Sequence, residues 1–168
     1  AYHFSGYWKD VGTISSLWEA NMEVLDPKNS GIDLFDEDWK IYSRNSGMTG
    51  HKIGSDAVIK NSMITDGCRI DGEVEHSVLF AGVKVAPGAV VKDAVVMGGT
   101  VIKPGAVVEH CIIGENAVIG ENAKIGVEKE GEDKGVATIG PGVYVGDGAT
   151  VGSNAMVREN VKDGEEEW

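Results

Sequence analysis

The sequence predicts a mainly β fold: a solenoid of short parallel strands, preceded by one amphipathic helix and a connector. Three observations predict it. Aliphatic residues recur every five or six positions along residues 51–168, turn-forming residues follow most of them at a fixed offset, and 24 of the 168 residues are glycine. Aromatic residues concentrate instead in residues 1–50, so we expect a boundary near residue 50.

The first part contains one predicted helix. Apolar residues recur there at helical spacing, at Ile14, Leu17, Trp18, Met22 and Leu25. Ser16 with Glu19 three residues later suggests a capping box at its start, and the run 26–31 ends it. Because one short amphipathic helix cannot form its own core, it must pack on the second part or on a preceding domain.

A connector over residues 32–50 follows the helix. We expect apolar anchors in it at Ile32, Leu34, Phe35, Trp39, Ile41 and Tyr42. The run 43–47 is typical of a loop.

The second part is a repeat of about 17 residues. Its aliphatic positions are spaced by six, five and six, as in Val91, Val96, Ile102 and Val108. Residues 70–85 carry a shorter copy, and residues 126–138 interrupt the series as an excursion loop. Three short strands and three corners per coil fit this spacing, with the aliphatics inward and about six or seven coils stacked roughly 4.8 Å apart.

The corners have their own residue types. Three positions after most aliphatics stands a residue that tolerates positive φ: Asp56, Gly67, Gly88, Gly105, Asn116, Asn122, Gly142, Gly148, Asn154 and Asn160. The tighter corners carry Asn61, His76, Asp93 and His110, beside a column of alternating charge at Lys60, Glu75, Lys92 and Glu109. We interpret both columns as polar ladders between coils. The alternative is that His76 or His110 is a catalytic base.

Composition and charge exclude several classes of protein. The net charge of −12 argues against a nucleic-acid or anionic-membrane binder, and no apolar run is long enough to cross a membrane. Cys68 falls in the column of small corner residues and Cys111 in a column with Ser62, Ser77 and Ala94, so both are predicted to be small buried residues. No CxxC spacing suggests a metal site. Two cysteines form no disulfide framework, so we expect a cytoplasmic protein.

Two segments resemble known families. Residues 51–168 resemble hexapeptide-repeat proteins, which form left-handed parallel β-helices; the handedness rests on that resemblance. The motif at residues 7–13, Tyr-Trp-Lys-Asp-Val-Gly-Thr, and the run 16–22 resemble the end of the catalytic domain of bacterial glucose-1-phosphate adenylyltransferases. Further similarity covers residues 34–42, 71–80 and 90–93.

The second resemblance implies an enzyme that makes ADP-glucose and pyrophosphate from ATP and glucose 1-phosphate for glycogen biosynthesis. Two aspartates hold Mg²⁺ in that family, and Asp10 matches the second of them. The glycine-rich phosphate loop and the lysine for the sugar phosphate have no counterpart in residues 1–168. Since the chain also begins within the motif, we expect it to be a C-terminal fragment, inactive alone.

The resemblance also implies roles for residues 1–50 and 51–168. Residues 1–50 would be the end of the nucleotidyltransferase domain plus a linker, and residues 51–168 a β-helix domain for domain packing, homotetramer contacts and allosteric regulation. Some members carry arginines for a regulatory sugar phosphate after residue 80, where this chain offers only Lys84. Two alternatives remain: a non-catalytic regulatory paralogue that partners an active subunit, and a hexapeptide-repeat acyltransferase that uses acyl-CoA.

Overall fold

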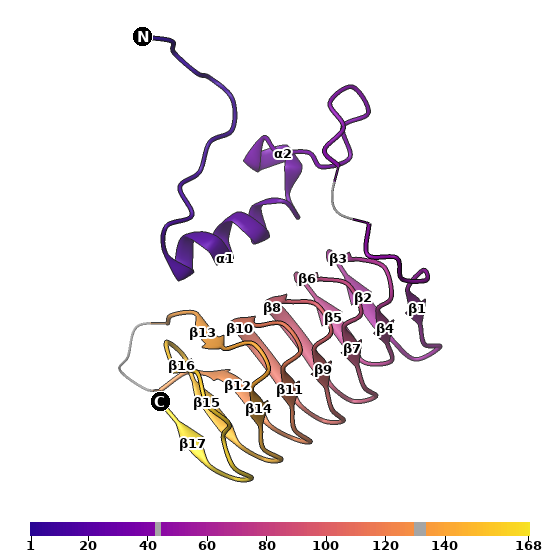
Figure 1. Cartoon of the computed structure of the whole chain (residues 1–168), viewed down its shortest axis with the longest axis vertical. Coiled ribbons are helices and arrows are strands. Elements are labelled where there is room, and N and C mark those ends of the chain that lie inside the picture. Colours follow the sequence, from indigo (N-terminus) through magenta and orange to yellow (C-terminus); the bar gives the residue numbers. More distant parts are fainter. Residues whose placement is uncertain (43–44, 130–133) are drawn as a thin grey trace.

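The computed structural model describes residues 1–42, 45–129 and 134–168. It confirms the predicted fold class, a mainly β parallel solenoid of about seven coils. Figure 1 shows the coils stacked in one row, with two helices, α1 (Ile14–Glu23) and α2 (Pro27–Ser30), along one side. None of the helices in the described ranges is both long and apolar enough to cross a bilayer.

Two sheets run along the stack. The six-stranded sheet contains, in spatial order, β1 (Lys52–Ile53), β4 (Arg69–Ile70), β7 (Lys84–Val85), β9 (Val101–Ile102), β11 (Val118–Ile119) and β14 (Tyr144–Val145). The 11-stranded sheet contains, along its main path, β2 (Val58–Lys60), β5 (Glu73–Glu75), β8 (Val90–Val96), β10 (Val107–Ile113), β12 (Lys124–Val127), β15 (Thr150–Gly152) and β17 (Glu166–Glu167). Its side branches are β3 (Met63–Ile64), β6 (Val78–Leu79), β13 (Ala137–Ile139) and β16 (Met156–Val157).

The strand register reproduces the repeat. Lys52 pairs with Arg69, which lies 17 residues further along, whereas Arg69 pairs with Lys84 after the predicted shorter coil of 15. Val118 pairs with Tyr144, an offset of 26 that accommodates the interruption. Residues 130–133 of the predicted excursion lie outside the described residues, and its flanks belong to β12 and β13.

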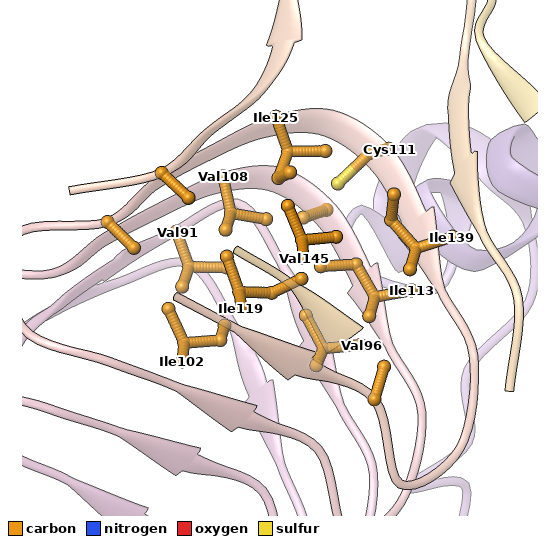
Figure 2. Close-up of a cluster of buried hydrophobic side chains, with 14 of the residues drawn as sticks. Val91, Val96, Ile102, Val108, Cys111, Ile113, Ile119, Ile125, Ile139 and Val145 are labelled. Carbon is orange, nitrogen blue, oxygen red and sulfur yellow. The ribbon is translucent and has the colours of Figure 1, made fainter. Parts of the chain in front are cut away.

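The core is the inside of the coil. Figure 2 shows inward aliphatic side chains stacked on their equivalents from neighbouring coils. Burial of each such side chain contributes roughly 1.5–3 kcal/mol to folding. Cys68 and Cys111 are buried among them, as predicted, and burial raises the pKa of both thiols. Neither is therefore a candidate nucleophile.

The corners use backbone conformations that side chains rarely adopt. Positive φ occurs at most of the predicted positions, among them Gly88 and Asn122, but not at Asp56 or Asn160. Some inner positions exclude a side chain through close contact instead. A Cβ on Gly120 would lie 2.5 Å from the carbonyl carbon of Gly146 in the next coil.

Helix α1 begins one residue after Thr13, not at Ser16 as the sequence suggested. The Thr13 side chain accepts a hydrogen bond from the Ser16 backbone N–H, and the Ser16 hydroxyl accepts one from Thr13 N–H. This reciprocal pair is the capping box, so Glu19 is free to make a different contact.

The connector departs from its prediction. Phe35, Trp39 and Tyr42, predicted as anchors, are 77–87% exposed. Asp33 accepts a hydrogen bond from the Phe35 backbone, so local turns shape this segment rather than packing on the solenoid. The Met48 side chain instead approaches the first corners, where a Cβ on Gly82 would lie 3.2 Å from it. Residues 43–44 of the predicted loop lie outside the described residues.

Candidate functional site

Helix α1 lies on the outside of the solenoid, which answers the question the sequence left open. Met22 is buried in an apolar seam between the helix and the sheet. Its buried neighbours on the solenoid are Val78, Val95, Ile112 and Val136, and Leu17, Trp18 and Leu25 pack at the margin. The predicted amphipathic face therefore packs on the second part of the chain.

Beside this seam lies the column of tight corners. Asn61, His76, Asp93 and His110 have φ of 38°, 44°, 48° and 45°. Residues other than glycine rarely adopt this left-handed region, and asparagine, aspartate and histidine are the types enriched in it. Nδ1 of His76 lies 2.7 Å from Oδ1 of Asp93, so adjacent coils are linked as the predicted polar ladder requires.

Trp18 joins the helix to that column. Its indole Nε1 donates a hydrogen bond of 2.7 Å to the backbone carbonyl of Asp93, and its ring centroid lies 4.3 Å from that of His110. Desolvation, more than any nearby charge, lowers the pKa of His110 below its usual value. We call Trp18, Asp93 and His110 the helix seat. Both candidate histidines thus have structural partners here, which favours the ladder interpretation over a catalytic base.

The column of alternating charge forms pairs of opposite charge between adjacent coils, as the sequence predicted. Glu75 pairs in register with Lys60 on one side and with Lys92 on the other. The Lys60 ammonium lies 3.5 Å from the Glu75 carboxylate and 3.4 Å from that of Glu73. Such exposed pairs contribute modestly to stability.

The segment before α1 is bound to the helix by its own polar side chains. The Lys9 ammonium contacts Glu19 at 2.8 Å and Glu23 at 2.7 Å, and the Tyr7 hydroxyl donates to Glu23 at 2.6 Å. The hydrogen bonds that Lys9 donates to Glu19 and Glu23 raise the pKa of Lys9, and those that Glu23 accepts from Lys9 and Tyr7 lower the pKa of Glu23. We call residues 7–13 the arm. These contacts of Lys9 and Tyr7 with the helix were not predicted from the sequence, although the i, i+4 spacing of the two glutamates indicates them.

Asp10 stands at the turn between the arm and the helix. Its Oδ1 accepts a hydrogen bond of 3.0 Å from Gly12 N–H, and the side chain is exposed. A Cβ on Gly12 would lie 3.2 Å from that oxygen, so glycine favours this turn. Within the described ranges, no group of three or more potential ligands gathers to hold a metal ion. Asp10 presents one carboxylate, the hard oxygen ligand that Mg²⁺ prefers.

Lys84 lies elsewhere, on the six-stranded sheet. Its partner in the register is Arg69, which pairs in turn with Lys52, so three exposed cations follow one another across adjacent coils. The Arg69 Nε donates to Asp71 at 2.8 Å. Like charges opposite one another destabilise a sheet, and the Asp71 carboxylate offsets part of this repulsion.

Comparison with known proteins supports the resemblance. The family model described as "GlmU-like, C-terminal hexapeptide" matches residues 46–146. A glucose-1-phosphate adenylyltransferase of Clostridium perfringens is 57% identical over 97 residues, covering 58% of this chain and 25% of the relative. Enzymes of the same name from Geobacillus stearothermophilus and Clostridium beijerinckii are 53% identical over 92 residues and 50% identical over 95 residues, respectively. These matches cover 55% and 56% of this chain and 24% of each relative. The chain spans about a quarter of the length of these curated relatives.

Proposed function

The chain belongs to the GlmU-like C-terminal hexapeptide family, and from this premise we propose that it is the C-terminal region of a glucose-1-phosphate adenylyltransferase. The observation that carries the proposal is identity of 50–57% to enzymes of that name, in a chain that joins the arm motif to a solenoid. The full-length protein would form ADP-glucose and pyrophosphate. A phosphate oxygen of glucose 1-phosphate attacks the α-phosphorus of ATP, and pyrophosphate leaves.

In this proposal, the contribution of the arm to the reaction is Asp10. When bound, Mg²⁺ neutralises phosphate charge and orients the reacting groups. Mg²⁺ sites of this kind use one or two carboxylates together with substrate phosphates, so a single aspartate from this chain fits the donor set. The Gly12 hydrogen bond fixes one Asp10 oxygen, and the exposed position leaves the carboxylate accessible to a ligand from solvent.

The solenoid would serve packing, assembly and regulation. We propose that it contacts the catalytic domain of the full-length protein. We also propose that it contacts other subunits in a homotetramer, or a paralogous subunit. Lys84, in the row with Arg69 and Lys52, would bind an anionic effector. A cytoplasmic location fits the two unpaired cysteines.

The test is a substrate panel on the full-length protein. We expect Mg²⁺-dependent release of pyrophosphate from ATP only when glucose 1-phosphate is present. A folded tetramer without this activity that activates a catalytic subunit would support the paralogue instead. A folded trimer that binds acetyl-CoA would support the acyltransferase. Substitution of Lys84 by alanine should weaken activation by a sugar phosphate without changing the basal rate.

A further inference from the structure

The helix seat has a histidine at a corner position that other residue types also fill. Its corner residue His110 occupies the left-handed region, which non-glycine residues rarely adopt and in which asparagine, aspartate and histidine are all enriched. Asn61 shows that the same column accepts asparagine three coils away. The histidine ring is therefore not needed to form the corner, and its contact at the site is with Trp18.

Trp18 fixes the helix in direction as well as in position. The apolar seam around Met22 holds α1 on the sheet, but apolar contacts are non-directional and allow the helix to slide or rotate. The hydrogen bond from the indole to the Asp93 carbonyl, at 2.7 Å, is directional. It ties one point of the helix to one coil of the solenoid.

The arm is in turn fixed to the helix at both ends. Lys9 and Tyr7 bind Glu23 in the last turn of α1, and the Thr13–Ser16 capping box fixes the entry of the chain into the first turn. Asp10 lies between these two attachments. Its position relative to the solenoid therefore follows from the placement of α1.

We infer that Trp18 is a positioning residue that places the Asp10 carboxylate, through α1, at a distance and angle set by the solenoid. The inference rests on the proposed function, because it assigns a purpose to the position of Asp10. It adds a role for the solenoid in the reaction itself: the two adjacent coils that contain Asp93 and His110 are the reference frame for a metal ligand.

The test uses the full-length enzyme and two graded variants of Trp18. Trp18→Phe removes the indole donor and keeps an aromatic ring, and Trp18→Leu removes both. Loss of one hydrogen bond at the seat should raise the Mg²⁺ concentration for half-maximal activity by about fivefold in Trp18→Phe, and by more in Trp18→Leu. His110→Asn, which keeps the corner and the indole hydrogen bond but removes the ring contact, should raise that concentration by less than Trp18→Leu. Trp39→Phe changes an exposed tryptophan of the connector and should match the wild type.

Folding is checked on the same samples. Far-ultraviolet circular dichroism should show unchanged solenoid content, and hydrogen exchange should accelerate at residues 10–13 but not in β8 or β10. A fall in rate proportional to the loss of folded protein, with unchanged Mg²⁺ dependence, would overturn the inference. So would wild-type Mg²⁺ dependence in both Trp18 variants.

An Asp10→Asn variant separates this inference from the proposed function. If Asp10→Asn abolishes activity while the Trp18 variants behave as the wild type, the proposed function stands and the positioning role is wrong. If Asp10→Asn retains full activity, the metal role of Asp10 is wrong, and the positioning role falls with it.

Discussion

Replacing Ile119 by alanine tests whether the stacked interior holds the solenoid together. Ile119 is fully buried and lies in register between Ile102 and Val145 of the adjacent coils. The substitution removes three carbons, worth about 2.4 kcal/mol in transfer free energy. Because coils on both sides prevent collapse, a cavity remains, and the total loss in the free energy of unfolding should be about 3–4 kcal/mol.

Ile53 provides the matched control. It occupies the same place in the repeat, but β1 is the terminal strand of its sheet and the side chain is 40% exposed. Ile53→Ala should therefore lose roughly 1.4 kcal/mol, since part of the side chain is already in water and no closed cavity forms.

Urea titration of the chain, followed by circular dichroism, measures both values. Hydrogen exchange shows in addition whether Ile53→Ala frays only the first coil, as nearest-neighbour stacking predicts. Equal destabilisation by the two substitutions, or a loss below about 1 kcal/mol for Ile119→Ala, would refute the reasoning from stacked coils.

Three further predictions follow from the corners and the interior. Since burial and then the Lys134 charge lower the folded-state pKa of His110, against the opposing charges of Asp93, Glu128 and Glu109, stability should be full above about pH 6.5 and fall as the pH drops through that lowered value; a smaller decline in His110→Asn is expected, and an unchanged decline would assign the effect elsewhere. Gly120→Ala, whose Cβ would meet backbone, should lose about 1–3 kcal/mol in urea titration, whereas Gly50→Ala, with open space, should be neutral; similar losses would contradict the close contact. Both buried thiols should resist a thiol reagent until urea unfolds the chain, and rapid labelling of native protein would disprove their burial.

The solenoid was predictable because its signal is local and repeated. Each coil repeats the same spacing, so Val91 and Val108 were predicted to occupy equivalent positions in adjacent coils. Their pairing in register confirms this prediction. Asn116 and Asn122 likewise indicate corners, and both have positive φ. The left-handed φ of His76 and His110 was not predicted, although histidine is enriched in that region together with asparagine and aspartate.

The contacts of the helix seat could not be predicted from the sequence. Trp18 and Asp93 lie 75 residues apart, and their bond joins an indole to a backbone carbonyl, which leaves no pattern in side-chain type. Helical spacing predicted which face of α1 is apolar, but not what covers it. The prediction of apolar anchors in the connector was wrong for the same reason. Phe35 and Trp39 are apolar but exposed, because apolar character alone does not identify a packing partner.

The most direct test of the account is the rate of Mg²⁺-dependent pyrophosphate release by the full-length enzyme with Asp10→Asn. Asp33→Asn is the matched control, because Asp33 is an exposed aspartate whose Oδ1 also accepts a backbone N–H two residues on. We predict a loss of at least about 100-fold for Asp10→Asn and a wild-type rate for Asp33→Asn. A folded Asp10→Asn enzyme with a rate within about twofold of the wild type would contradict the account.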